Sequence, residues 1–265
     1  MSLPRVSIVM PAYNRSAFIG EAIASLQGQA GVEGDIIVVD DGSTDDTARI
    51  VEGIATADRR VRLLLRSHGG VAAARNTGIA AITGDYVTFL DSDDICAPGR
   101  LARQAAKLQA RPDVAAVVGD LVLFDEMTPD FQPAPNSQWE RVLGVSLTTA
   151  TFRRSVFDEI GPMDESLRQG EDLDFYMRLI ETGALFLIEV EVATYYRRHA
   201  GNMTNDVRGM RRDAVRALFR SRMRQRRSGR VGFIEPFFYK KFEMETEFGG
   251  PGHSARPETS LSSSA

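Results

Sequence analysis

The chain has 265 residues, 43% of them hydrophobic and 26% charged, and a formal net charge of −4 at pH 7. This length and composition can bury a substantial core as one large domain or two small ones, and the net charge argues against a nucleic-acid binder. Cys96 is the single cysteine, which excludes an intramolecular disulfide. No signal-peptide pattern or membrane-spanning apolar run is present, so a cytoplasmic location is expected.

Strand and helix patterns alternate through the first part of the chain. Short apolar runs predict strands, and apolar residues at helical spacing predict helices. The expected strands cover 6–10, 36–39, 61–65 and 86–90; the expected helices begin near Ser16 and after Thr44, and a third covers 71–82. This alternation predicts an α/β fold with a mostly parallel central sheet flanked by helices.

The second part of the chain is less regular. The patterns predict helices over 98–110, 155–160 and 171–181, strands over 114–124, 147–152, 185–188 and 193–197, and a loop over 128–139. Ten arginines interleaved with apolar residues predict a basic amphipathic helix over 208–230. From 249 onward Gly, Pro and Ser dominate, which predicts a disordered tail.

Two of the predicted strands end in clustered aspartates. Asp40 and Asp41 follow one strand, and Asp91 and Asp93 follow another. The carboxyl ends of parallel strands lie along one edge of a sheet, where such folds bind ligands. Asp91 and Asp93 would point to the same side, and two such carboxylates repel unless a cation lies between them. The pattern predicts a site for a hard divalent metal and a phosphorylated ligand, with a solvated acidic turn as the alternative.

Several enzyme classes lack support in the sequence. No Gly-x-Gly-x-x-Gly follows the first strand, and neither Gly-x-x-x-x-Gly-Lys-Ser/Thr nor Gly-x-Ser-x-Gly occurs. These absences disfavour a dinucleotide enzyme, a P-loop phosphotransferase and a serine hydrolase. Three histidines and one cysteine offer no zinc-site spacing.

Five short motifs occur in order over roughly residues 5–200. They are Pro11-Ala12-Tyr13-Asn14, Val39-Asp40-Asp41-Gly42-Ser43-Thr44-Asp45, Gly70-Val71-Ala72-Ala73-Ala74-Arg75-Asn76-Thr77-Gly78, Phe89-Leu90-Asp91-Ser92-Asp93-Asp94 and Gly170-Glu171-Asp172. In this order and spacing the chain resembles the family 2 glycosyltransferases of the GT-A fold. The expected domain then covers 1–204, with a Rossmann-like donor half at about 1–95 and an acceptor half at about 96–204. A basic helical extension over 205–248 and a tail over 249–265 would follow.

The resemblance implies a nucleoside-diphosphate sugar donor, with a UDP-sugar favoured, a divalent Mn²⁺ or Mg²⁺ ion, and inversion at the anomeric carbon. It implies that the nucleotide is bound by Pro11, Ala12, Tyr13, Asp41, Arg75, Asp91 and Ser92. Asp93 is the implied metal ligand, with His199 as a further candidate. The purely structural alternatives are helix capping and turn formation for the Asp40–Asp41 pair, an ion pair for Arg75, and a surface position for His199.

By the same resemblance, Asp172 is the candidate general base, and Glu171 supports it or binds the acceptor. The alternative is that both acids only stabilise the start of a helix. Trp139 is a candidate for stacking on an acceptor sugar, or else it packs in its loop. The Gln-x-x-Arg-Trp motif of processive members is missing, so transfer of one sugar to a hydroxyl of a lipid-linked or growing glycan is expected.

Two other functions and three roles for the basic helix stay open. A sugar nucleotidyltransferase would need a Gly-rich loop after the first strand, and Pro11-Ala12-Tyr13-Asn14 stands there instead. A non-catalytic nucleotide-sugar-binding protein would not need Asp91, Asp93 and Asp172 together. The Arg208–Arg230 helix could meet the inner face of a membrane, form a homodimer contact or simply face solvent.

Overall fold

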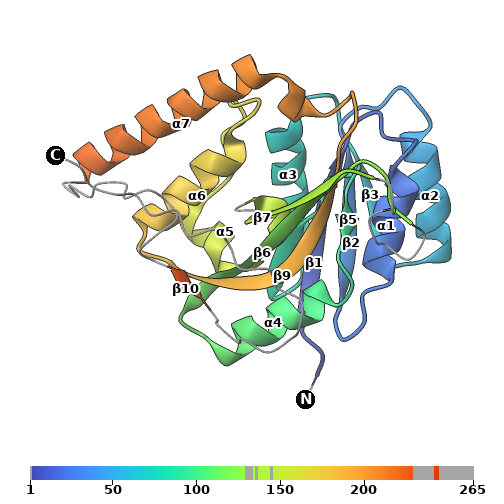
Figure 1. Cartoon of the computed structure of the whole chain (residues 1–265), viewed down its shortest axis with the longest axis horizontal. Coiled ribbons are helices and arrows are strands. Elements are labelled where there is room, and N and C mark those ends of the chain that lie inside the picture. The colour runs from blue at the N-terminus through green and yellow to red at the C-terminus, as the bar shows by residue number, and fades with distance from the viewer. Residues whose placement is uncertain (1, 129–133, 135–136, 144–145, 229–241, 245–265) are drawn as a thin grey trace.

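A computed structural model describes residues 2–128, 134, 137–143, 146–228 and 242–244 (Figure 1). Its strands are β1 (Arg5–Ala12), β2 (Glu33–Asp40), β3 (Val61–Leu65), β4 (Tyr86–Phe89), β5 (Ile95–Cys96), β6 (Val114–Phe124), β7 (Trp139–Leu143), β8 (Ala150–Arg153), β9 (Leu185–Arg197) and β10 (Phe242–Met244). Its helices are α1 (Ile19–Gln27), α2 (Thr47–Ala57), α3 (Val71–Ile79), α4 (Arg100–Ala110), α5 (Ser155–Ile160), α6 (Glu171–Glu181) and α7 (Val207–Arg227), with 3₁₀ turns η1 (Leu147–Thr149) and η2 (Met203–Asn205).

The described strands form one mixed sheet in the order β10-β9-β6-β8-β4-β1-β2-β3, with β5 on β9 and β7 on β6. The first four strands, β1 to β4, pair in parallel, as the alternating sequence pattern predicts. β8 inserts antiparallel between β4 and β6, and β6 and β9 run parallel beyond it. The predicted α/β fold with a central sheet and flanking helices is confirmed; the sheet is parallel from β1 to β4 and mixed beyond β4.

Helices cover both faces of the sheet (Figure 1). Successive side chains of a strand point to opposite faces, so Ile8 and Met10 of β1 pack with α1, α2 and α4, while Val9 packs with α3 and the aromatic side chains of α5 and α6. Burial on both faces explains why the central strands are apolar throughout, without polar alternation.

The structure differs from the expected elements mainly in the second part of the chain. β9 is one strand where two were predicted, because its pairing with β6 continues through register shifts past Glu189 and Glu191. Glu189 is buried there and is paired with Arg103 and Lys107. β7 was not predicted, and the predicted strand over 147–152 begins instead as the turn η1. Such edge pairing is set by the neighbouring strand and not by local periodicity.

The helical part of the predicted C-terminal extension is present as α7, and the predicted tail over 249–265 lies outside the described residues. None of the described helices is both long and apolar enough to cross a bilayer.

Phe152 of β8 is the centre of the aromatic core between the sheet and α6. Its ring lies 5.6–6.4 Å from the ring centroids of Phe89, Phe157, Phe175 and Tyr176. Phe152→Ala is expected to lower the free energy of unfolding by about 3–5 kcal/mol, because it leaves a cavity that fixed neighbours cannot fill. Urea denaturation measures this; the exposed Leu65→Ala is the control, expected to change it by less than about 0.5 kcal/mol.

Candidate active site

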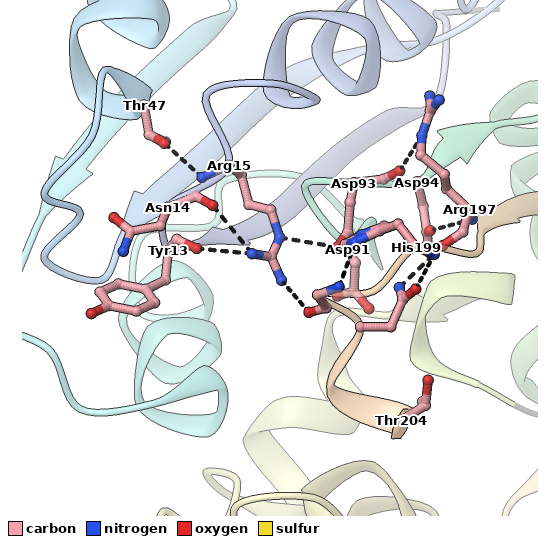
Figure 2. A network of polar contacts seen from close by, with 12 residues as sticks. Tyr13, Asn14, Arg15, Thr47, Asp91, Asp93, Asp94, Arg197, His199 and Thr204 are labelled. Atoms are coloured by element: carbon pink, nitrogen blue, oxygen red, sulfur yellow. Dashed lines mark hydrogen bonds and ion pairs between the residues drawn. The ribbon is translucent and has the colours of Figure 1, made fainter. Parts of the chain in front are cut away.

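The five motifs meet at the carboxyl-terminal edge of the parallel strands. β1, β2 and β4 end there, the N-terminus of α6 lies at this edge, and the chain after β9 crosses it (Figures 1 and 2). Pro11 and Ala12 are the last residues of β1 and pair with β2, and Ser92 is buried in the turn after β4. The predicted convergence of Asp40, Asp41, Asp91 and Asp93 along one edge follows from this topology.

The loops after β1 and β2 are bonded to each other through side chains. Asn14 has a left-handed backbone (φ 51°), its N–H donates to Ser43 Oγ (2.9 Å), and its Oδ1 accepts from Thr44 N–H (2.8 Å). Thr47 Oγ1 accepts from the Arg15 N–H (2.8 Å). These bonds fix the directions of the two side chains on either side of Asn14.

Asp93 lies between the side chains of Arg15 and His199, which come from distant parts of the chain (Figure 2). Arg15 Nε donates to Asp93 Oδ2 at 3.0 Å, and His199 Nε2 lies 3.0 Å from the same oxygen. The Gly201 N–H donates to His199 Nδ1 (3.1 Å), so a neutral ring carries its proton on Nε2 and donates it to Asp93. The ring also stacks on Phe18 at 4.7 Å. His199 therefore holds Asp93 in this arrangement.

Arg75 joins the acidic turn after β4 to the start of α6. It lies on α3 and is buried; its Nη2 donates to Asp91 Oδ1 (2.8 Å) and its Nη1 donates to Glu171 Oε1 (2.6 Å). Burial lowers the pKa of Arg75, but the Asp91 and Glu171 carboxylates outweigh burial and raise it. The ion pair that the sequence left as an alternative for Arg75 is therefore present.

Glu171 and Asp172 are adjacent in sequence but differ in their surroundings. Glu171 is buried and accepts a second hydrogen bond from the Gly170 N–H (2.9 Å). Asp172 is half-buried, accepts one hydrogen bond from the Leu173 N–H (2.7 Å), and has no ion-pair partner within the described ranges. Burial raises the pKa of both Glu171 and Asp91, and the nearby charge of Asp172 adds a smaller increase to each. Asp172 is thus the acid at the start of α6 whose carboxylate is open to a ligand.

Asp41 is engaged by the loop after β3. Its carboxylate accepts from the Gly69 and Gly70 N–H groups (3.0 and 2.7 Å) and from Arg66, and His68 Nδ1 lies 2.9 Å away. Asp40 accepts from the Ser43 N–H (3.0 Å), which is the turn-forming alternative for that residue. Beside them Tyr13, 40% exposed, lies on His68 with ring centroids 4.2 Å apart. The two rings, tilted by 31°, form an exposed aromatic surface next to Asp41.

Asp94 ties the acidic turn to β9. Its Oδ1 accepts from the Arg197 N–H (3.0 Å), and Arg197 Nε donates to the Asp93 carbonyl (3.1 Å) (Figure 2). Burial, followed by the Asp91 and Asp93 charges, raises the pKa of Asp94 well above its usual range. The acidic turn after β4 is therefore fixed to the end of β9 by Arg197.

Trp139 lies at the start of β7, opposite Phe124 in the register of β6. Its side chain is 57% exposed. Phe124 is also opposite Arg197 at the end of β9, so Trp139 is at the same edge of the sheet as the acidic turn. Its predicted contact with an acceptor stays a prediction.

The residues of the acidic turn fit a hard divalent cation in part. Asp91 and Asp93 offer carboxylate oxygens, and the repulsion between them contributes to the raised pKa of Asp91, which a cation would relieve. Among the described side chains, no three of His, Cys, Asp or Glu are grouped closely enough to hold a metal alone. These two side chains would supply only part of a coordination shell, and oxygens of a ligand or of water would have to complete it.

Three residues of this site were not predicted from the sequence. Arg15 directly follows the first motif, His68 precedes the glycines of the third, and Arg197 lies beside His199. Their positions next to motifs are the signal that was available. Their roles depend on partners far away in the chain, which local patterns do not reveal.

Comparison with known proteins identifies a matching family and a similar fold. A family model described as Glycosyl transferase family 2 matches residues 7–163. The crystal structure of Staphylococcus aureus TarS 1–349 in complex with UDP-GlcNAc is similar, with a TM-score of 0.60 and 21% identity, covering 76% of this chain and 61% of that one. That likeness supports a GT-A type fold.

Curated relatives are similar in sequence. The chain is 30% identical to the O-antigen biosynthesis protein RfbC of Myxococcus xanthus over 249 residues, covering 89% of this chain and 19% of that protein. It is 33% identical over 126 residues to the GalNAc(5)-diNAcBac-PP-undecaprenol beta-1,3-glucosyltransferase of Campylobacter jejuni, covering 47% and 40% of the two chains. The chain spans less than half the length of these two relatives. Because the family model matches more than half of it, the chain belongs to glycosyl transferase family 2.

Asp45 offers a test of how the two loops are held. Its Oδ2 accepts from the Ser16 N–H (3.0 Å) and its Oδ1 from the Thr47 hydroxyl (2.5 Å) and N–H (3.0 Å). Asp45 is exposed, and the desolvation that it does experience opposes ionisation, but these bonds outweigh it and lower the pKa of Asp45 from 3.8 to about 2. The folded state thus favours the carboxylate, and its contribution to stability is present above pH 3.8 and is lost as the pH falls towards 2.

Asp45→Asn is therefore expected to lower the melting temperature at pH 7 by about 2–4 °C, and this deficit should shrink as the pH falls below 3.8. Thermal denaturation monitored by circular dichroism over a pH series measures it. The exposed Asp85→Asn is a matched control that should show no such deficit. A deficit that stays constant across the pH series would contradict the role given to the Asp45 charge.

Proposed function

We propose that the protein is an inverting glycosyltransferase that moves one sugar from a nucleoside-diphosphate sugar to a hydroxyl acceptor. The observation that carries this proposal is the separation of two kinds of carboxylate at one edge. Asp91 and Asp93 are suited to hold a metal and a diphosphate, while Asp172 has no ion pair among the described residues and lies on the proposed acceptor side. Arg75 and Glu171 fix the spacing between them.

The donor half, residues 1–95, is proposed to bind the nucleotide. The exposed Tyr13–His68 pair offers a surface on which a base can stack, next to the ends of β1 and β2. Asp41 would either bond the base directly or fix the position of the loop beside the base. The second role is compatible with the hydrogen bonds that its carboxylate already accepts from Gly69 and Gly70. A uridine nucleotide is favoured, because the structurally similar TarS was crystallised with UDP-GlcNAc.

Asp93, Asp91 and the donor diphosphate are proposed to hold Mn²⁺ or Mg²⁺. His199 beside Asp93 is a further candidate ligand, which would bind the ion only after Nε2 released the proton that it donates to Asp93. When bound, the ion would stabilise the negative charge of the leaving nucleoside diphosphate. The guanidinium of Arg15 contributes a positive charge next to Asp93, which it contacts. If Asp93 held a metal, the Arg15 guanidinium that now contacts it would be available to bond a phosphate oxygen.

Asp172 is proposed to take the proton of the acceptor hydroxyl as that oxygen attacks the anomeric carbon. Direct attack from the side opposite the leaving group inverts the configuration there. Glu171 is held by Arg75 and the Gly170 N–H, so it is a positioning residue that orients the start of α6. Burial of Glu171 keeps it away from the acceptor.

The acceptor half, residues 96–204, is proposed to bind a glycan or a lipid-linked sugar, with Trp139 as a stacking surface. The names of two relatives point to this class, since one concerns O-antigen biosynthesis and the other a sugar chain on PP-undecaprenol. A role in the synthesis of a cell-envelope polysaccharide follows as part of the proposal.

Asp93→Asn tests the donor and metal site. The native chain is expected to bind UDP more tightly with Mn²⁺ than without it, because the ion links the diphosphate to the protein. The variant should lose about tenfold or more of the Mn²⁺-dependent affinity in titration calorimetry, while Asp85→Asn retains it. Equal Mn²⁺-dependent binding by the native and Asp93→Asn chains would refute the metal assignment.

Asp172→Asn tests the base and separates a transferase from a protein that only binds nucleotide sugars. The variant should bind UDP and Mn²⁺ like the native chain, yet release UDP from the bound nucleotide sugar about 10²–10⁴-fold more slowly. The matched control is Asp158→Asn, an acid in the first turn of the neighbouring α5. Similar losses in both variants would assign Asp172 to helix stabilisation, and full activity in Asp172→Asn would reject it as the base.

A further inference from the structure

The outer face of α7 combines arginines with exposed apolar side chains. Residues at helical spacing place Arg208, Arg211, Val215, Leu218, Phe219 and Arg222 on one side, and we call these six residues the outer face. Val215, Leu218 and Phe219 are 65%, 45% and 66% exposed. The face extends for about 21 Å along the helix. Large apolar side chains that are exposed side by side and rimmed by polar residues mark an interaction site, so this face is a candidate binding surface.

The opposite side of α7 is fixed to the domain (Figure 1). Asp213 is buried and accepts from the Arg168 and Gln169 N–H groups (3.1 and 3.2 Å) just before α6. Arg224 pairs with Asp174 and Glu181 of α6. The inner side is therefore bonded to the segment that carries Asp172, and the outer face is presented by a rigidly held helix.

The charges of the outer face have one sign. Its three arginines have no hydrogen bond or ion pair within the part of the chain that the structure describes. The only acid within α7 is Asp213, which lies buried on the inner side. Two copies of this chain that met through the same face would bring arginine against arginine, and repulsion would oppose such a symmetric dimer. The face is complementary to a dense negative surface with an apolar layer beneath it.

We propose that the outer face of α7 binds a membrane surface that contains anionic phospholipids. The arginines would bond lipid phosphates, while Val215, Leu218 and Phe219 enter the boundary between headgroups and acyl chains. A helix of this kind lies in the plane of the membrane and does not cross it. Because α7 is bonded to the segment before α6, binding would hold the acceptor side of the proposed site at a fixed orientation to the lipid surface.

Vesicle flotation of the full 265-residue chain tests this. The probes are vesicles of phosphatidylcholine alone and of phosphatidylcholine mixed with phosphatidylglycerol. The chain is expected to bind the mixed vesicles, to bind the neutral vesicles at least about tenfold more weakly, and to dissociate as salt is raised. Sugar transfer is not needed for this readout, so the result is independent of the proposed enzymatic function.

Matched variants assign the binding to this surface. Leu218→Asp and Arg211→Glu should each weaken vesicle binding by about tenfold or more. Their controls are Leu3→Asp, at a leucine that is 46% exposed against 45% for Leu218, and Arg59→Glu, at an exposed arginine of the loop after α2. Circular dichroism confirms that each variant is folded before it is compared.

Three outcomes would overturn the proposal. The first is equal or absent binding to the two kinds of vesicle by the native chain. The second is retention of binding in both α7 variants. The third is a native dimer in sedimentation equilibrium that Leu218→Asp converts to monomer, because the outer face would then be a contact between copies of the chain.

Discussion

The buried guanidinium of Arg75 is the constraint on which the rest of the site depends. A buried cation is costly unless carboxylates surround it, and here Asp91 comes from the turn after β4 while Glu171 begins α6. One side chain on α3 thereby fixes the distance between the two functional parts of the edge. The acids that face the proposed donor and the acid that faces the proposed acceptor are positioned relative to each other by this bridge.

The acidic turn is held from the other sides as well, and each partner comes from a different element. Arg15 and His199 bond Asp93, and the Arg197 N–H bonds Asp94. Placing several negative charges together requires cations and N–H groups around them, which explains why the loops after β1 and β9 converge here. The same convergence brings two additional basic groups to the proposed site of a leaving diphosphate, where developing negative charge would be stabilised.

α7 has a similar double role on the outside of the domain. Its inner side supplies Asp213 to the segment before α6, and Gly170 has a positive φ of 158° in close contact with the Asp213 backbone. A side chain at Gly170 would both strain the backbone and meet that contact. The arginines and apolar side chains of the outer face are left for a partner. The helix is therefore structural on one side and available for binding on the other.

The sequence by itself determined the alternating elements, the parallel arrangement of β1 to β4 and the edge at which the aspartates gather, because periodicity and strand direction are local properties of the chain. It also determined the family through its five ordered motifs. Only the tertiary structure decided which partner each acid has. Arg15 and Asp93 are 78 residues apart, and Arg75 and Glu171 are 96 apart. Such pairs depend on how loops and helices pack, so Arg75 proved to be an ion-pair bridge, Asp41 proved to be engaged by its neighbouring loop, and Asp172 was left as the open carboxylate.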